Sequence, residues 1–387
     1  MKALQVASHR SITRGGAVQV YRLARELRRR GHDVTCVFHA RGGAPAARDA
    51  QTLEKVKEAG LRLLFYDMTS LRALLDFRRF LREERFDAIH SHRELALRFA
   101  TFATLLGPSS SVFVTNRGTT YPLRPFTLTR WLFRRRRLDR VVAVAQAVKD
   151  ALVESGGLPP EKIDVIYGSV NPEDFNPDRF DPADCRRAFG IPPDARVVGT
   201  VASFAPKKGY DDFFRAAAAL LREMERRPAS PAVRILAVGG GVEKRMSSLV
   251  DALGIRDRLV FTGHCENVPA ALAAMDVFVC ASTKGEGLTG AVREAMAMRR
   301  PVVSTDVSGN GEIVRDGETG LLVPTRDPAS LCRAVRRLLD DPEEARRLAQ
   351  AGHDLAAREF PDAIRGDRIE ALYASIARQR SLDKSRH

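Results

Sequence analysis

The chain has 387 residues, of which 44% are hydrophobic and 29% are charged. This composition excludes a disordered chain, and the length favours two globular domains over a single hydrophobic core. No apolar run is long enough to span a bilayer, and the first residues lack the pattern of a signal peptide, so we expect a cytoplasmic protein.

The formal net charge is +15. It predicts an anionic partner, for which nucleic acid, acidic phospholipid and phosphorylated glycan all qualify, but solvated arginine-rich helix faces explain it equally well. The 5 cysteines are far apart, odd in number and form no C-x-x-C pair. We therefore expect reduced thiols, with neither a disulfide framework nor a metal site.

The first part of the chain contains a β-α-β unit. Residues 2–7 are a short apolar run typical of a buried parallel strand, and a glycine turn follows at residues 13–16. An amphipathic helix then leads to a strand at residues 34–38, an order that requires a parallel sheet with a right-handed crossover. The rhythm continues with strands predicted at residues 61–65, 88–90, 112–115 and 141–145, and helices at residues 71–84 and 147–155.

A second set of β-α units begins after residues 171–184, whose Pro and Asp content excludes a long regular element. We expect an α/β fold with two doubly wound, Rossmann-like domains over residues 1–168 and 169–361. Ligands bind beyond the carboxyl ends of the strands in such sheets, so two facing domains would enclose a cleft. Residues 362–387 are expected to form a helix that packs on the N-terminal domain, and then a short tail. The strands of the second domain are predicted at residues 197–201, 233–238, 259–261, 277–279 and 301–304.

The strongest local pattern lies where a predicted strand, a glycine turn and the start of a helix follow one another. We expect free amides there at Leu288, Thr289 and Gly290, which would favour a phosphate. Glu286 and Glu294 are expected to face the same cleft, where carboxylates would accept hydrogen bonds from a sugar and a ribose. Taken alone, the pattern fits a turn acid and an acid that compensates the helix dipole equally well.

The pair Glu286-x7-Glu294, with residues 294–297 (EAMA) and 301–303 (PVV), resembles the retaining GT-B glycosyltransferases of family four. Other segments match that family in the right order, so the likeness covers nearly the whole chain. It implies the GT-B fold, in which two Rossmann-like domains face each other across a cleft. The other matching segments are Gly15-Gly16 with residues 23–34, the interdomain residues 143–170, and residues 327–328 and 340–343.

The resemblance assigns roles to residues of the C-terminal half. Glu286 matches the acid that contacts the donor-sugar hydroxyls, and Glu294 matches the acid that binds both ribose hydroxyls. Lys208 matches the lysine that neutralises the leaving diphosphate, which is the main electrostatic requirement of the reaction. The amides that hold the diphosphate match those of Leu288, Thr289 and Gly290.

In the N-terminal half, Gly15 and Gly16 match a glycine loop through which the backbone approaches the phosphates, although an ordinary tight turn would look the same. His92 matches a histidine near the reacting sugar carbon, and we expect it at the rim of the cleft. The alternative is a structural histidine, the commoner use of a lone one.

The chain departs from the family beside Lys208. Ser203 stands where the family usually has an arginine. We expect either that Lys207 or Arg117 supplies the missing charge, or that the diphosphate is bound more weakly. Arg117 replaces the histidine of the family's HG pattern, and its guanidinium is expected to face a phosphate or carboxylate of the acceptor.

We therefore predict a retaining, metal-independent glycosyltransferase that needs no cofactor. It would move a sugar from a nucleoside-diphosphate sugar to a hydroxyl of a surface glycan or glycolipid, such as the lipopolysaccharide core. The alternatives are another GT-B chemistry, namely sugar epimerisation or synthesis of a sugar phosphate, and, less favoured, a non-enzymatic binder of anionic polymers.

Residues 129–140 combine Trp131, Leu132 and Phe133 with four consecutive arginines. This combination favours peripheral binding to an anionic surface, here the inner face of the cytoplasmic membrane, as much as it favours an ordinary amphipathic helix. No nucleic-acid partner is expected, because the other basic residues are scattered and lack interleaved aromatic side chains.

Overall fold

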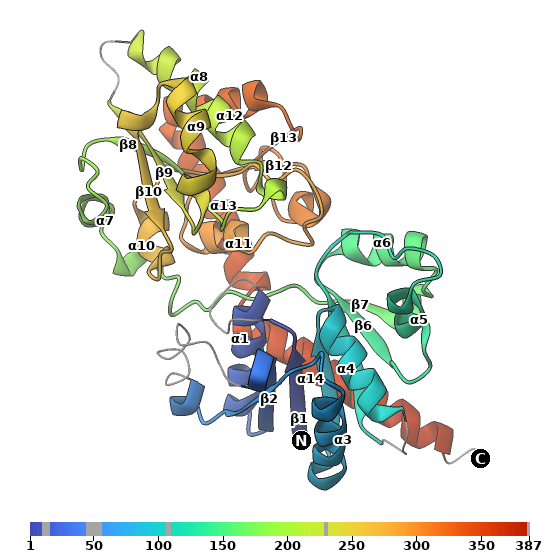
Figure 1. Ribbon diagram of the computed structural model, residues 1–387. Coiled ribbons are helices and arrows are strands. Elements are labelled where there is room, and N and C mark those ends of the chain that lie inside the picture. Colours follow the sequence, from blue (N-terminus) through green and yellow to red (C-terminus); the bar gives the residue numbers. More distant parts are fainter. Residues whose placement is uncertain (10–15, 44–55, 106–109, 228–230, 385–387) are drawn as a thin grey trace. The chain divides into compact units, whose positions relative to one another are not determined.

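A computed structural model describes residues 1–9, 16–43, 56–105, 110–227 and 231–384 of the chain (Figure 1). The chain divides into two compact units. Unit 1 comprises Met1–Ser169 and Asp362–His387, and unit 2 comprises Val170–Pro361. Each unit contains its own parallel sheet, so the predicted α/β class with two Rossmann-like, doubly wound domains is confirmed. That the two face each other across a cleft stays a prediction.

The sheet of unit 1 has the strand order β3-β2-β1-β4-β5-β6-β7 in the described residues, and all its strand pairs are parallel. The order reverses at the β1–β4 pair, because β2 and β3 lie on one side of β1 and the later strands on the other. Such a reversal leaves a crevice at the carboxyl ends of the two central strands. The strands are β1 (Lys2–Ala7), β2 (Asp33–His39), β3 (Arg62–Tyr66), β4 (Ala88–His92), β5 (Val112–Arg117), β6 (Arg140–Ala143) and β7 (Ile163–Val165).

Helices alternate with these strands, as their amphipathic patterns predict. In α1, residues Val20, Leu23 and Leu27 recur at helical spacing and are buried in the same core as the sheet residue Val34. The helices of this part are α1 (Gly16–Arg29), α3 (Leu71–Glu84), α4 (Glu94–Thr104), α5 (Leu128–Arg134) and α6 (Gln146–Gly156).

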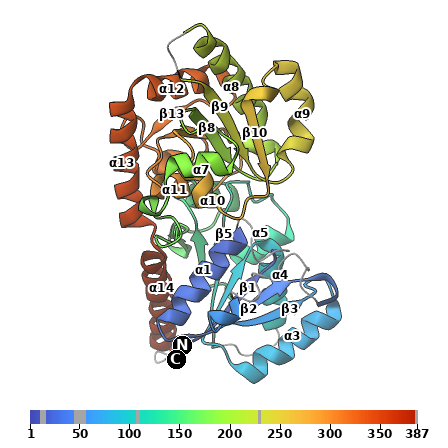
Figure 2. The same cartoon turned by 90° about the vertical axis from the view of Figure 1, so that its left-hand side faces the viewer.

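The last helix, α14 (Asp362–Lys384), belongs to unit 1 although it follows unit 2 in the sequence. It lies alongside α1 (Figure 2). Its residues Ile369 and Tyr373 are fully buried in the core that α1 also lines. The guanidinium of Arg30, near the end of α1, pairs with the carboxylates of Asp367 at 2.5 Å and Glu370 at 3.2 Å. The final helix therefore packs with α1 in the hydrophobic core of unit 1.

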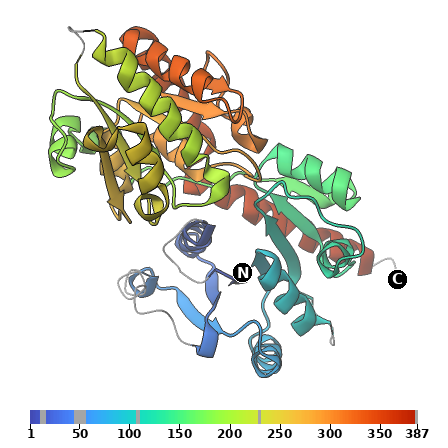
Figure 3. The ribbon, with the colours of Figure 1, turned by 45° about the horizontal axis from the view of Figure 1, so that its top comes forward.

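Unit 2 repeats the architecture with the strand order β10-β9-β8-β11-β12-β13 in its described part, again parallel and with the reversal at β8–β11. The helices α8 and α12 run side by side over a core shared with the sheet (Figure 3). The strands are β8 (Arg196–Val201), β9 (Val233–Val238), β10 (Leu259–Gly263), β11 (Val277–Cys280), β12 (Val302–Thr305) and β13 (Leu321–Val323). The helices are α7 (Pro182–Ala188), α8 (Tyr210–Glu225), α9 (Val242–Leu253), α10 (Val268–Ala273), α11 (Gly290–Ala297), α12 (Pro328–Asp340) and α13 (Pro342–Glu359).

Two details differ from the sequence-based expectations in ways that affect the site. Strand β4 continues two residues beyond the predicted end and includes His92. The predicted glycine turn at residues 13–16 is described only at Gly16, where α1 begins. None of the helices in the described ranges combines the length and the apolar character that crossing a membrane requires.

Candidate functional site

The candidate site of unit 2 lies where the loops after β8 and β11 meet. These strands are parallel neighbours, so their carboxyl ends lie at one edge of the sheet, at the point where the strand order reverses. The backbone N–H of Thr283 donates to the carbonyl of Lys207 at 2.8 Å, and the Lys207 ammonium donates to the carbonyl of Gly285 at 3.4 Å. The two loops therefore form one structure rather than two independent turns.

Gly209 makes this close approach possible. It has a φ of +65° and ends the short 3-10 turn η5 (Pro206–Lys208). A Cβ atom at this position would lie 1.8 Å from the carbonyl oxygen of Ala281, so a side chain is excluded by both conformation and space.

We expect Gly209→Ala to destabilise unit 2 far more than Gly254→Ala. Gly254 has nearly the same φ, +68°, but nothing lies within 4 Å of its Cβ position. The control should therefore cost only the left-handed strain of about 1–2 kcal/mol, and Gly209→Ala about 2 kcal/mol or more beyond it. Scanning calorimetry of both variants measures the difference, and equal unfolding temperatures would show that the loops are not in contact.

Three of the predicted residues come together in this loop pair. The Glu286 carboxylate oxygen Oε1 lies 3.2 Å from the Lys207 Nζ and 3.0 Å from the Lys208 Nζ. Glu286 is only 8% exposed, while both lysines are half-buried. Two ammonium groups on one carboxylate leave a local excess of one positive charge, which suits an anion such as a diphosphate. Of the two residues proposed to replace the family's arginine, Lys207 is the one found here.

At the start of α11, two of the three backbone amides that we expected to be free are free in the described part of the chain. Helix α11 begins at Gly290, with Thr289 as its N-cap residue. The prediction is wrong for Thr289, whose N–H donates to the Oδ1 atom of Asn310 at 3.2 Å. Within the described residues the N–H groups of Leu288 and Gly290 have no hydrogen-bond partner. Two amides of the loop therefore stay available to an anion.

Asn310 explains this difference, and the sequence interpretation missed it. It lies in the turn η7 (Ser308–Glu312), is fully buried, and its side-chain nitrogen donates to the Ser304 hydroxyl at 3.1 Å. The amide group thus holds the loop before α11 against the end of β12. The only signal in the sequence is an Asn between two glycines, which is typical of any turn.

Glu294 lies in the second turn of α11 and is half-buried. Within the described residues its carboxylate has no hydrogen bond or ion pair, so it is available to a ligand, unlike that of Glu286. Ser203 lies in the loop after β8 and is exposed. Its neighbour Phe204 fixes that loop, because the Phe204 N–H donates to the carbonyl of Gly240 at 3.0 Å.

In unit 1, His92 is part of a closed ring of five side chains at the β1–β4 reversal. The His92 Nε2 donates to the Gln5 Oε1 at 2.8 Å, and the Gln5 amide donates to the Tyr373 hydroxyl at 3.4 Å. The Tyr373 hydroxyl donates to the His90 Nδ1 at 2.7 Å, and the His90 Nε2 donates to the Asn116 Oδ1 at 2.9 Å. The Asn116 amide closes the ring by donating to the His92 Nδ1 at 2.9 Å. Each member both donates and accepts when both histidines are neutral.

The environment keeps these histidines neutral. Burial lowers the pKa of His90 to about 3, against an ordinary 6.5, and burial beside His90 and Arg365 holds the pKa of His92 well below its ordinary value. The two imidazole rings stack with their centroids 4.4 Å apart. If both imidazoles were protonated, two cations would be in contact inside unit 1.

The place of His92 at the rim of a cleft stays a prediction, but its imidazole is not open to a ligand in unit 1. Its side chain lies inside unit 1, the residue is 3% exposed, and both ring nitrogens are occupied. An imidazole in this state is not a free acid or base, but it can hold the end of β4 in place. The sequence interpretation missed its partners Gln5, Asn116 and Tyr373, which follow no local pattern.

The glycine loop is described only in part. Gly15 lies outside the described residues, and Gly16 is the first residue of α1. A Cβ atom on Gly16 would lie 2.6 Å from the His9 Nε2, so a side chain here would displace that imidazole. Burial and the positive charge of Arg93 lower the pKa of His9 to about 4, so this ring too is held neutral.

Arg117 does not present its guanidinium to an acceptor. The residue is 7% exposed, and its Nη1 donates to the Glu94 carboxylate at 2.6 Å. The other nitrogens donate to the carbonyls of Tyr121 at 2.6 Å and Thr119 at 3.2 Å. The prediction of an acceptor-facing arginine is therefore wrong, because the side chain is used to tie the loop after β5 to α4.

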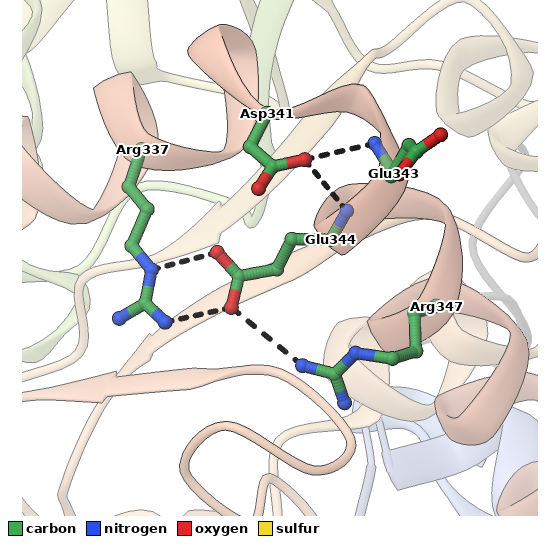
Figure 4. Close-up of a pocket in the computed structure, with 5 residues that line it drawn as sticks. All are labelled: Arg337, Asp341, Glu343, Glu344 and Arg347. Atoms are coloured by element: carbon green, nitrogen blue, oxygen red, sulfur yellow. Dashed lines mark hydrogen bonds and ion pairs between the residues drawn. The ribbon is translucent and has the colours of Figure 1, made fainter.

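Unit 2 also has a hollow between the end of α12 and the start of α13 (Figure 4). It contains none of the predicted residues. The Glu344 carboxylate accepts from the Arg337 guanidinium at 2.6 and 2.7 Å, and Asp341 accepts from the Glu343 and Glu344 N–H groups. The Arg337–Glu344 pair joins α12 to α13, and Asp341 caps the start of α13. This structural use explains why the charged side chains gather here. In the described ranges no group of three or more His, Cys, Asp and Glu side chains is arranged to hold a metal ion.

Comparison with known proteins agrees with the motifs. Residues 13–174 match the family model Glycosyltransferase Family 4, and residues 195–341 match Glycosyl transferases group 1. The 2-deoxystreptamine N-acetyl-D-glucosaminyltransferase of Streptomyces fradiae is 31% identical over 385 residues, which cover 90% of this chain and 88% of that protein. The lipopolysaccharide core biosynthesis glycosyltransferase LpsE of Rhizobium meliloti is 28% identical over 364 residues, 93% of this chain and 96% of that protein.

Other relatives match this chain over only part of their length, and the solved structures match it at low sequence identity. Three further curated relatives are matched over only 61%, 56% and 49% of their own length. The crystal structure of Anabaena HepE with UDP and glucose has a TM-score of 0.80 at 20% identity, and the match covers 97% of this chain and 100% of that one. This likeness concerns the fold alone. The family resemblance predicted from the spread of motifs is confirmed: the chain belongs to the group 1 glycosyl transferases of glycosyltransferase family 4.

Proposed function

We propose that this protein is a retaining glycosyltransferase that takes a sugar from a nucleoside-diphosphate sugar. The observation that carries the proposal is the Lys207–Glu286–Lys208 cluster at the strand-order reversal of unit 2. The departing nucleoside diphosphate gains negative charge, and two adjacent ammonium groups in a half-buried loop stabilise that charge before the bond breaks.

The diphosphate, the ribose and the donor sugar would each be bound by a group of this chain. The N–H groups of Leu288 and Gly290 would donate to the diphosphate at the start of α11. The Glu294 carboxylate would accept from both ribose hydroxyls. Glu286 would exchange one ammonium contact for the donor-sugar hydroxyls once the lysines bind phosphate.

The reaction that we propose is a same-face displacement. The glycosidic carbon–oxygen bond to the diphosphate breaks while the acceptor oxygen bonds to the same face of the anomeric carbon, and the leaving phosphate takes the acceptor proton. His92 is assigned a positioning role in this scheme, because its nitrogens are occupied.

For the acceptor we propose a hydroxyl of a surface glycan or glycolipid, with the lipopolysaccharide core as the example. Support comes from the R. meliloti lipopolysaccharide core glycosyltransferase, which is matched over 96% of its length. The S. fradiae relative is named for 2-deoxystreptamine. An aminocyclitol is therefore the second acceptor to test beside a glycan.

A nucleotide screen tests the donor site without knowledge of the acceptor. We expect one of UDP, GDP and ADP to raise the melting temperature of the protein, because a ligand at about 100 times its Kd stabilises by about 2.7 kcal/mol. Glu294→Ala should remove most of that shift, whereas Glu318→Ala, an exposed acid of unit 2, should leave it unchanged. If no nucleotide shifts the melting temperature, or if both variants respond like the parent, the donor site is placed wrongly. Consumption of a nucleotide sugar without an acceptor would instead indicate epimerisation or sugar-phosphate synthesis.

A further inference from the structure

An unusual group of exposed apolar side chains lies just beyond the carboxyl end of β5. Most large hydrophobic residues of the described chain are buried, yet four exposed ones occur within residues 121–131. They are Tyr121 at 45%, Phe126 at 106%, Leu128 at 40% and Trp131 at 42% exposed. Isolated exposed apolar residues need no explanation, but a cluster of this kind marks an interaction surface.

The helix α5 keeps this cluster in the solvent. Thr127 is its N-cap, with the hydroxyl accepting from the Arg130 N–H at 3.3 Å. Leu132 and Phe133 are buried, so the short helix already has a packed side. Trp131 is exposed all the same, so α5 is not an ordinary amphipathic helix that buries all three of its large apolar side chains Trp131, Leu132 and Phe133.

Phe126 adds a sign of strain. It has a φ of 56°, in the left-handed region that bulky residues avoid. Its side chain is held fully in solvent at the turn before α5. Strain of this kind persists where the presented side chain has a use.

The charged side chains within the segment itself are of one sign, and the carboxylate that touches it among the described residues is that of Glu94, which accepts from the Thr129 hydroxyl at 3.5 Å. Residues 121–136 contain arginines and no acidic residue. In the described part of the chain none of these arginines forms an ion pair with a carboxylate, and the Arg135 guanidinium lies over the Trp131 ring at 4.4 Å. The arginines are Arg124, Arg130, Arg134, Arg135 and Arg136.

A comparison within unit 1 shows that this combination is specific. Helix α3 also exposes two leucines, Leu71 at 72% and Leu75 at 57%. However, α3 carries Asp76, Glu83 and Glu84 among its arginines, and both glutamates form ion pairs. The exposed leucines of α3 lie among charges of both signs and so give no preference for an anionic surface. The exposed side chains of residues 121–136 lie in a segment whose charged residues are arginines only, which favours one.

We propose that residues 121–136, the aromatic–arginine surface, dock unit 1 on an anionic lipid bilayer. Phe126, Leu128 and Trp131 would enter the headgroup boundary, where Trp is favoured, and the arginines would face the acidic headgroups. A nucleic acid is the alternative anionic partner, and the test below separates it from a bilayer. The surface follows β5, the parallel neighbour of β4, so it lies at the same end of the sheet as His92. Docking goes beyond the proposed function and would bring that end of unit 1 to a lipid-linked acceptor.

Sedimentation of the full chain with vesicles tests the docking. We expect binding to vesicles of phosphatidylcholine mixed with phosphatidylglycerol, little binding to pure phosphatidylcholine, and weakening with salt. Phe126→Ser/Trp131→Ser and Arg124→Glu/Arg134→Glu should each weaken binding by about tenfold or more. The matched control Leu71→Ser/Leu75→Ser, which removes two exposed leucines of the same unit, should bind like the parent.

Equal binding to both kinds of vesicle, or equal losses in the control and in Phe126→Ser/Trp131→Ser, would overturn the proposal. So would binding of single-stranded DNA that depends on these residues when vesicle binding does not. The melting temperature of each variant shows whether it folds, and its shift with nucleotide shows whether the donor site is intact. Failure of docking therefore stays distinguishable from failure of the proposed function.

Discussion

Replacing Lys207 and Lys208 together with glutamine should both destabilise unit 2 and abolish sugar transfer. Glu286 is 8% exposed, and these two ammonium groups are its ion-pair partners at 3.2 and 3.0 Å. Removing both takes two counter-charges from a poorly solvated carboxylate, which costs about 3 kcal/mol. The same change removes the cations that would stabilise the leaving diphosphate, so kcat should fall by about 10²- to 10³-fold or more. Urea unfolding and initial-rate kinetics measure the two effects separately.

The triple variant with Glu286→Gln separates stability from catalysis. A neutral glutamine at this position no longer needs the lysines, so the triple variant should recover most of the lost free energy of unfolding. It should stay inactive, because neither the cations nor the sugar-binding carboxylate is present. A triple variant as unstable as the double one would show that Glu286 is not the reason for the instability. A double variant with near-normal turnover would remove the lysines from the mechanism.

The elements of this chain that depend on local pattern could be predicted from the sequence. Most strands of both sheets contain a short apolar run between polar or glycine turns, and such runs indicate buried parallel strands. The three-residue strands β7 and β13 were not predicted. Glu286 was found from the strand, glycine turn and helix start around it, whereas Lys207 and Lys208 were assigned from the family resemblance. Their contact follows from the sheet topology, which places the ends of parallel strands at one edge.

The side-chain partners could not be predicted in the same way. Gln5 and Tyr373 are 368 residues apart, and only the packing of α14 on unit 1 brings them together. For the same reason the role of Arg117 was misjudged, since an exposed acceptor-facing arginine and one that ties down a loop have identical local sequences. Thr289 likewise lost its free amide to Asn310, which comes from the next β-α loop.

Acid should unfold unit 1 well before it affects ordinary carboxylates, because it holds two buried neutral histidines, His90 and His92, and a half-buried one, His9. The pKa is lowered from 6.5 to about 3 for His90 and to about 4 for His9, and that of His92 is also well below 6.5. Well above pH 6.5 neither the folded nor the unfolded chain binds a proton at these rings. Below that value only the unfolded chain does, so the free energy of unfolding falls with decreasing pH until the folded pKa is reached. From about pH 7 to about pH 5 the loss should be about 2 kcal/mol for each histidine.

The chain's 1 tryptophan, Trp131, lies in unit 1, so its fluorescence reports this transition during urea unfolding at several pH values. His90→Asn should make the free energy of unfolding less dependent on pH, because one proton fewer is taken up when the chain unfolds. Tyr373→Phe tests the ring differently, because it leaves the His90 Nδ1 without its donor but keeps both histidines buried. It should lower stability by about 1–3 kcal/mol at every pH, with nearly the same slope. A free energy of unfolding that stays constant from about pH 7 to about pH 5 would mean that the histidines take up protons in the folded chain, and the closed ring would then be wrong.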